Sequence, residues 1–384
     1  MFLKRLISVF LCALVSLPLC LCTSVKTHAF DESQISAASA VLMDADSGKF
    51  LFEKNSHEVR ACASITKIMT LLLVMEEIDS GKISLNDTVT ASAHAASMGG
   101  SDIWLREGET MTVDEMIKAT VVVSANDAAV ALAELVSGSE SDFVARMNTR
   151  AGQLNMNDTV FKNCNGLDEE GHVTSAHDVA VMSAELVKHE KIFDYTSIWI
   201  DYLRDGKTQL VNTNKLLKSY DGITGLKTGT TSKAGSCISA TARRSGLSLI
   251  AVVLGSESGT QRFKDAAALL DYGFANFEVA PLTLENAAVE PLKVTKGMRK
   301  AVNVTCKTGD NILIAKGDKE KITCEFERTE ELEAPVKENT QIGTVTYKIG
   351  DEKLAQYPIV TCENVEEMTF SSVWSVLVNA LFSA

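Results

Sequence analysis

Two strand-like regions lie far apart in this 384-residue sequence, and the residues between them are mainly helical. Residues 37–55 and residues 225–256 each show the apolar alternation of paired strands. The stretch 101–190 is apolar and rich in alanine, and 262–277 forms another helical pattern. Strands at both ends of such a region must pair with each other to bury their apolar faces. We therefore predict one α+β domain over residues 30–277, with a sheet covered by helices.

The sequence changes character after residue 277. Short strand-like runs over residues 278–364 predict a small β-sandwich domain. Residues 365–384 then repeat apolar side chains at helical spacing, with serines mostly on the opposite face. Trp374 on the apolar face suits the headgroup boundary of a bilayer, so we predict an amphipathic helix that anchors the chain to a membrane surface. A terminal helix packed on its own domain is the alternative.

The first 29 residues read as a secretory signal peptide. Lys4 and Arg5 precede an apolar run that ends at Cys22, and small residues precede Phe30, where cleavage is expected. An uncleaved membrane anchor is the alternative, but the apolar run is short for a span. The sequence therefore predicts export.

The formal net charge of −13 argues against nucleic-acid partners, which require a basic face. Six cysteines follow residue 29, and export permits disulfides between them, but free buried thiols are equally compatible with the sequence. No C-x-x-C or H-E-x-x-H pattern is present, so we predict neither a metal site nor a cofactor.

A serine and a lysine stand three residues apart in "SITK", at Ser64 and Lys67, where a helix is expected to begin. A serine hydroxyl needs a base to become a nucleophile, and an amine can serve when burial keeps it neutral. At this spacing both side chains share one helix face, and the helix N-terminus adds backbone N–H groups. One helical turn could thus supply a nucleophile, its base and part of an oxyanion hole.

Two further motifs could complete such a site. "SAN" places Ser124 and Asn126 at the entry to a helical stretch, where a second hydroxyl could relay protons and an amide could hold a peptide bond. The same S-x-N pattern at Ser84 lies in a polar stretch and is interpreted as a turn.

The third motif is "KTG", with Lys227, Thr228 and Gly229 on a predicted strand edge. A cation and a hydroxyl would face substrate there, and glycine would allow close approach to the backbone. The same triplet at Lys307 is followed by a turn signal in the small β domain, and we favour Lys227.

The order and spacing of S-x-x-K, S-x-N and K-T-G resemble the penicillin-recognising serine hydrolases. Within them the chain most resembles the exported low-molecular-mass D-alanyl-D-alanine carboxypeptidases of peptidase family S11. The segments that carry the resemblance are "ASITKIMT", "VVVSANDAAVALAE", "GLDEEGHVTSAHDVA", "GLKTGTTSKAGSCISATA" and "LLDYGF". It implies a transpeptidase-like fold with an antiparallel sheet, peptidoglycan stems ending in D-Ala-D-Ala as substrates, and β-lactams as inhibitors. It also implies a place on the extracytoplasmic face of the bacterial cell membrane.

The resemblance also implies a role for each residue. Ser64 attacks the carbonyl between the terminal D-alanines, and Lys67 takes its proton. Ser124 relays a proton to the departing D-alanine, and Lys227 tunes Ser124. The remaining residues bind substrate: Asn126 holds the amide, Lys227, Thr228 and Arg262 receive the carboxylate, Gly229 gives access, and the N–H groups of Ser64 and Thr230 form the oxyanion hole.

Other interpretations remain open. A β-lactamase would need a deacylating glutamate, for which no E-x-x-x-N loop can be placed; a transpeptidase would use an amine as acceptor; and a non-catalytic wall-binding module would lack catalytic side chains. Arg262 could instead be a solvated helix arginine. His172 is predicted to be structural, and Cys62 and Cys237 to be packed thiols. Thr230 stands where some relatives carry histidine.

Overall fold

The computed structural model describes residues 30–309 and 311–382. The predicted signal peptide, residues 1–29, lies outside the described residues and stays a prediction.

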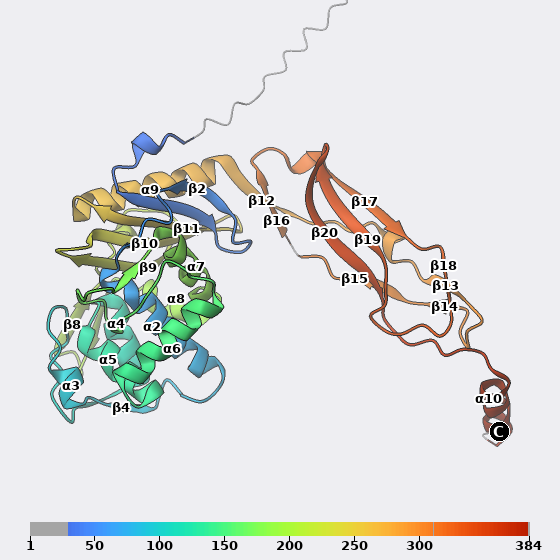
Figure 1. Cartoon of the computed structure of the whole chain (residues 1–384), viewed down its shortest axis with the longest axis horizontal. Helices are drawn as coiled ribbons and strands as arrows, with labels where there is room; N and C mark the ends of the chain where they lie inside the picture. Colours follow the sequence, from blue (N-terminus) through green and yellow to red (C-terminus); the bar gives the residue numbers. More distant parts are fainter. Residues whose placement is uncertain (1–29, 310, 383–384) are drawn as a thin grey trace, which may run out of the picture. The chain divides into compact units, whose positions relative to one another are not determined.

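A five-stranded antiparallel sheet unites the two distant strand regions, as the sequence predicted (Figure 1). Its strand order is β2-β1-β11-β10-β9. The bounds are β1 (Ser39–Asp44), β2 (Phe50–Lys54), β9 (Ile223–Thr231), β10 (Gly235–Arg244) and β11 (Leu247–Ser256). Residues 225–256 thus contain three strands where two were expected, because a turn between Thr231 and Gly235 folds β9 back from β10. This turn leaves β9 at the edge of the sheet.

Helices cover both faces of this sheet (Figure 1). On one face lies α9 (Gly259–Asn276), where Gly273 approaches so closely that a Cβ would be 2.4 Å from Leu249 Cδ1. Side chains alternate along a strand, so neighbours such as Ile250 face the opposite side. There they join the core formed with α2 (Lys67–Asp79) and α7 (Ala176–Leu186). The sheet is therefore buried on both faces.

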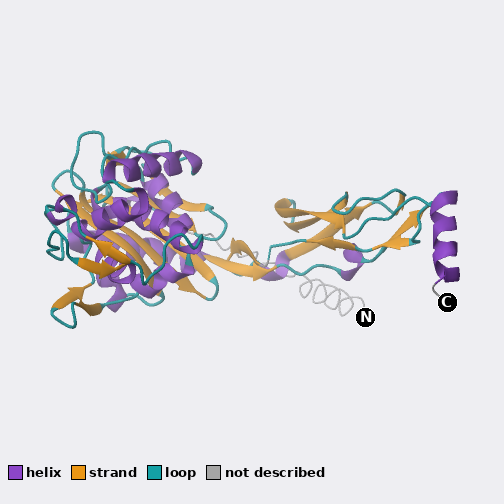
Figure 2. Cartoon of the chain, turned by 90° about the horizontal axis from the view of Figure 1, so that it is seen from below, coloured by secondary structure: helices purple, strands orange, loops and turns teal. Residues whose placement is uncertain are grey.

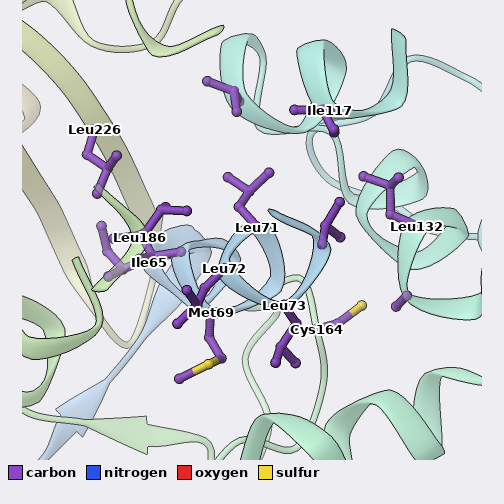
Figure 3. Close-up of a cluster of buried hydrophobic side chains, with 14 of the residues drawn as sticks. Ile65, Met69, Leu71, Leu72, Leu73, Ile117, Leu132, Cys164, Leu186 and Leu226 are labelled. Atoms are coloured by element: carbon purple, nitrogen blue, oxygen red, sulfur yellow. The ribbon is translucent and has the colours of Figure 1, made fainter. Parts of the chain in front are cut away.

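The central helix α2 is apolar on nearly all sides, and its side chains fill the middle of this core (Figure 3). A helix that is apolar all round is stable only when surrounded by other elements. Those elements include α5 (Asn126–Ser137), α6 (Glu140–Gln153) and α7. The domain also contains α3 (Ala93–Ala96) and α4 (Val113–Val122), which pack against α5, and α8 (Phe193–Thr196), which packs against α4. Short strand pairs complete the domain: β3 (Arg60–Ala61) with β6 (Val173–Thr174), β4 (Thr88–Thr90) with β5 (Thr110–Thr112), and β7 (Ile200–Leu203) with β8 (Thr208–Val211). Lys67 stands at the first position of this buried helix.

The region after α9 is built almost entirely of strands and loops, as predicted (Figure 2). A two-stranded ribbon of β12 (Phe277–Pro281) and β16 (Asn311–Ala315) comes first. One sheet has the order β14 (Ala301–Val302), β13 (Leu292–Thr295), β18 (Glu331–Glu333); the other has β15 (Val304–Cys306), β20 (Glu352–Thr361), β19 (Gln341–Ile349), β17 (Ile322–Arg328). Val302, Val345 and Ile359 belong to a separate buried cluster. This region therefore has its own core.

The terminal helix α10 runs over Phe370–Phe382 and begins five residues later than predicted. Val365 is only 2% exposed and pairs with Val336 through two backbone hydrogen bonds, so it belongs to the β domain. Phe370, Trp374 and Phe382 are 85%, 60% and 88% exposed. No helix among the described residues is long and apolar enough to cross a membrane.

Candidate active site

Ser64 lies in a short 3-10 helix, η2 (Ala63–Thr66), that leads directly into α2. The predicted helix start at Ser64 is thus a tighter turn, with the α-helix beginning at Lys67. The amine Nζ of Lys67 lies 3.2 Å from Ser64 Oγ. Ser64 is partly exposed, whereas Lys67 is fully buried. The structure therefore places the two groups in hydrogen-bond contact, with Ser64 the more accessible of the two residues.

The surroundings of Lys67 favour its neutral form. Burial lowers the pKa of its amine to about 7, although the nearby Cys164 and Asp127 oppose this shift. Its Nζ also lies 2.6 Å from Asn126 Oδ1 and 2.6 Å from the backbone oxygen of Asn165. The Ser64–Lys67 pair predicted from the sequence is thus held in place by Asn126 of the S-x-N motif. It is also held by the backbone oxygen of Asn165, a contact that the sequence did not predict. Because Asn165 acts through its backbone, no side-chain pattern could have revealed it.

Ser124 connects α4 to α5 and is held in an unusual backbone conformation, with φ of 64°. Its side chain is 5% exposed, and its Oγ has no hydrogen-bond partner among the described residues. Buried hydroxyls are normally paired, and positive φ is costly for serine. Strain and an unpaired polar atom together are typical of functional positions.

Asn126 begins α5, and three hydrogen bonds fix its position. Its N–H donates to Ser101 O at 2.7 Å, its Nδ2 donates to Gly99 O at 2.7 Å, and its Oδ1 accepts from Lys67. By contrast, the S-x-N pattern at Ser84 forms a turn in which the Ser84 N–H donates to Asp87, as the sequence indicated.

On β9, Lys227 and Thr228 are 2% and 4% exposed. Burial lowers the pKa of Lys227 well below its usual range, and the nearby Lys67 and Arg262 lower it further. Thr228 Oγ1 lies 2.6 Å from Thr213 Oγ1. Two buried amines therefore lie within electrostatic reach of one another.

Gly229 brings β9 against the start of η2. A Cβ at this position would lie 3.0 Å from Ser64 N and 3.0 Å from Ala63 Cβ. The close contact between β9 and η2 is a reason for this glycine that the sequence did not predict, and the expected approach of substrate to its backbone stays a prediction.

Arg262 is 9% exposed, so the alternative of a solvated helix arginine is wrong. Its Nη1 donates to Gly229 O at 2.9 Å, to Thr230 Oγ1 at 2.8 Å and to Cys237 O at 3.3 Å. Its Nε is buried without a partner among the described residues. The guanidinium thus lies beside the K-T-G strand, and Thr230 is exposed at the end of that strand.

The predicted packed thiols are buried. All six cysteines beyond residue 29 are free: Cys62, Cys164, Cys237, Cys306, Cys324 and Cys362. Burial raises the pKa of Cys62 and of Cys237, which disfavours reactive thiolates. Within the described residues, no group of three or more His, Cys, Asp or Glu side chains could hold a metal ion.

Comparison with known proteins agrees with this geometry. Residues 25–258 match the family model described as D-alanyl-D-alanine carboxypeptidase, peptidase family S11. The chain belongs to this family. Residues 277–367 match the C-terminal domain of penicillin-binding protein 5. The fold class and the serine-hydrolase class predicted from the sequence are confirmed.

Individual relatives cover nearly the whole chain. D-alanyl-D-alanine carboxypeptidase DacF of Bacillus subtilis is 42% identical over 373 residues, which are 96% of each chain. The crystal structure of penicillin binding protein 5 from Haemophilus influenzae superimposes with a TM-score of 0.78 at 30% identity, covering 88% of this chain and all of that one. Penicillin-Binding Protein D2 from Listeria monocytogenes, solved in an ampicillin-bound form, has a TM-score of 0.58 at 33% identity and covers 62% of this chain and 98% of that one.

Proposed function

We propose that this chain removes the terminal D-alanine from peptidoglycan stem peptides through an acyl-enzyme on Ser64. The observation that carries the proposal is the contact between Ser64 Oγ and the buried amine of Lys67, whose pKa is lowered to about 7. A neutral amine in that position can accept the serine proton.

In the first step, Lys67 takes the hydroxyl proton while Ser64 Oγ bonds to the carbonyl carbon between the two D-alanines. The carbonyl oxygen becomes an oxyanion, which the N–H groups of Ser64 and Thr230 stabilise. Gly229 supports this arrangement because it has no side chain and lets strand β9 approach η2 closely.

In the second step the C–N bond breaks, and the departing D-alanine amine receives a proton through the Ser124 hydroxyl. That hydroxyl is buried and has no hydrogen-bond partner among the described residues, which leaves it available to bond to the substrate amine. Water then attacks the acyl carbon, and the ester bond to Ser64 breaks to regenerate the free hydroxyl.

The substrate carboxylate is bound at β9 by Lys227 and Thr228, with Arg262 behind them. A carboxylate near Lys227 would favour the charged amine, which burial alone disfavours. Lys227, Thr228 and Arg262 are cations or hydrogen-bond donors that bind a free carboxylate. Cleavage is therefore restricted to the C-terminal residue of the peptide. β-Lactams would acylate the same Ser64.

A β-lactamase receives no support from this site. Among the described residues, Lys67 bonds to Ser64, Asn126 and Asn165, and none of these contacts is to a carboxylate that could activate deacylating water.

The place of action proposed here is the outer face of the cell membrane, reached through the signal in residues 1–29. The exposed Phe370, Trp374 and Phe382 of α10 support binding to a bilayer surface. Flotation of the chain with zwitterionic lipid vesicles tests this binding. Trp374→Ser should reduce the bound fraction severalfold, whereas the exposed Ser375→Ala should not; equal binding by both variants would contradict the anchor.

The activity is tested by D-alanine release from a peptide ending in D-Ala-D-Ala. The parent chain should release D-alanine, and Ser64→Ala should release none. Release by the variant at the parent rate would exclude the proposed mechanism. Transfer to an added amine in preference to water would identify a transpeptidase instead.

A further inference from the structure

His172 is buried beside the candidate site, yet the steps above do not use it. It directly precedes β6, which pairs with β3, and β3 leads through Cys62 into η2. This pairing places His172 next to the turn that carries Ser64.

A chain of hydrogen bonds connects His172 to that turn. The backbone N–H of Lys162 donates to His172 Nδ1 at 2.9 Å, so the ring proton of the neutral imidazole is on Nε2. Nε2 lies 2.7 Å from Thr66 Oγ1 and therefore donates to it. The Thr66 hydroxyl in turn donates to Ala63 O at 2.9 Å. The chain ends on the carbonyl of the Ala63–Ser64 peptide.

A peptide unit is planar and trans, so its carbonyl and its N–H point in opposite directions. Fixing the direction of Ala63 O therefore fixes the direction of the Ser64 N–H. Ala63 has φ of 48°, a conformation that an alanine does not prefer and that its surroundings must hold.

Two glycines enclose the same peptide unit. A Cβ at Gly166 would lie 1.9 Å from Ala63 O, and a Cβ at Gly229 would lie 3.0 Å from Ser64 N. The peptide is thus confined by packing on both sides, and the hydrogen bond from Thr66 acts on its carbonyl end.

We propose that His172 is a positioning residue for acylation, which acts through Thr66 to hold the Ser64 N–H in the direction that an oxyanion hole requires. This inference rests on the proposed function. His172 touches neither substrate nor the reacting atoms in this account; it sets the orientation of a donor.

The ring stays neutral over the working range of the enzyme. Burial lowers the pKa of His172 to about 4, with Lys162 acting in the same direction and Asp168 and Glu169 opposing. The remaining contacts, from Thr66 and the ring of Phe161, are uncharged. The hydrogen-bond chain therefore keeps its direction at pH values where Lys67 becomes neutral.

The test compares variants of two members of the hydrogen-bond chain, His172 and Thr66, and each variant is made in the full protein. His172→Leu and Thr66→Val should each slow acylation of Ser64 by a penicillin about 10- to 100-fold, less than the loss expected for deleting an oxyanion donor. KM for a D-Ala-D-Ala peptide should stay within about threefold, because only transition-state binding is affected. The double variant should be acylated no more slowly than the slower single variant, because both substitutions break the same hydrogen-bond chain.

Conservative variants should rescue the effect. Thr66→Ser keeps the hydroxyl and should be acylated faster than Thr66→Val. His172→Gln keeps a donor to that hydroxyl and should be acylated faster than His172→Leu. Phe161→Leu is the packing control: it disturbs a buried ring against His172 without removing a hydrogen bond, and it should lower the melting temperature but leave acylation within about threefold.

Equal slowing by Phe161→Leu, or multiplicative losses in the double variant, would overturn the positioning role and leave His172 as a packing residue. If His172→Leu does not fold, Thr66→Val against Thr66→Ser decides the question. Failure of the unmodified chain to be acylated would instead contradict the proposed function.

Discussion

The triplet Lys-Thr-Gly occurs twice in this chain, and the two copies have very different surroundings. In β9, Lys227 is 2% exposed, electrostatically coupled to Lys67, and followed by a glycine that touches η2. In the β domain, Lys307 and Gly309 are exposed. The atom nearest to a Cβ at Gly309 would be the end of a tyrosine side chain, Tyr357 Oη, at 3.1 Å, and the backbone oxygen of Asn311 would be at an ordinary contact distance of 3.8 Å.

The difference teaches that burial and neighbours, rather than the three residue types, determine what a motif can do. An exposed lysine is solvated and screened, whereas a buried amine next to another cation has its pKa lowered and can exchange a proton near neutral pH. Three effects on catalysis test this contrast and are given in order of decreasing size, and one effect on stability follows them.

Replacing the buried base should have the largest effect. Lys67→Met should lower the acylation rate constant about 10³- to 10⁴-fold, the upper part of the range of general-base catalysis. In the parent, acylation should rise with pH up to about 7 and then level off, because the neutral amine is the active form and the pKa is near that value.

A stopped-flow pH profile with a fluorescent penicillin checks this prediction. A Lys67→Met variant that keeps the same profile at a similar rate would show that another group is the base.

The two lysines of the triplets form a matched pair. Lys227→Ala should lower kcat/KM for a D-Ala-D-Ala peptide about 100-fold, since a charge-assisted contact to the carboxylate is lost in a buried setting. Lys307→Ala should change it less than twofold, because that side chain is exposed in the other domain. Comparable losses in steady-state assays of both variants would refute the assignment of the motif.

The two glycines form a second pair with a smaller effect. Gly229→Ala should lower kcat/KM about 10-fold, because its Cβ would lie 3.0 Å from Ser64 N and push η2 away from β9. Gly309→Ala should be nearly neutral, because a flexible side-chain end can move aside. The measurement is kcat/KM together with the melting temperature of each variant, and an inactive, destabilised Gly309→Ala would contradict the contrast.

The last effect concerns stability below neutral pH and not the rate of catalysis. The pKa of His172 is about 4 in the folded chain and about 6.5 when unfolded, so the unfolded state binds more protons between these values. The unfolding free energy should therefore fall as the pH drops from 6.5 to 4, by on the order of 3 kcal/mol from this group.

Urea unfolding at several pH values checks this prediction. The contribution should be absent in His172→Leu and retained in His57→Gln, whose histidine side chain is 62% exposed. If the unfolding free energy of His172→Leu falls with pH as steeply as that of the parent, the effect comes from other groups.

Local spacing in the sequence was sufficient to predict the two strand regions, the central helix and the Ser64–Lys67 pair, but not the turn that separates β9 from β10. Each of these rests on contacts between residues close in sequence, or on apolar periodicity that only one element type satisfies. The prediction placed the start of the terminal helix at Val365, although the apolar helical pattern itself begins at Phe370. Val365 is instead paired with Val336 through an isolated β-bridge, and this long-range backbone contact has no local sequence signal.

Contacts to backbone atoms of residues far apart in the sequence could not be predicted either. The bond from Lys67 to Asn165 O, the chain from His172 to Ala63 O and the bonds of Arg262 to Gly229 O depend on the folded backbone. No residue type is required at an acceptor of this kind, so no pattern marks it.

The central claim is that Ser64 becomes acylated with the buried Lys67 as its base. The most direct measurement is mass spectrometry of the chain after brief exposure to a penicillin, with peptide mapping of the adduct. We expect one penicilloyl group on Ser64 in the parent and none in Ser64→Ala. An adduct on another residue, or equal labelling of Ser64→Ala, would contradict it.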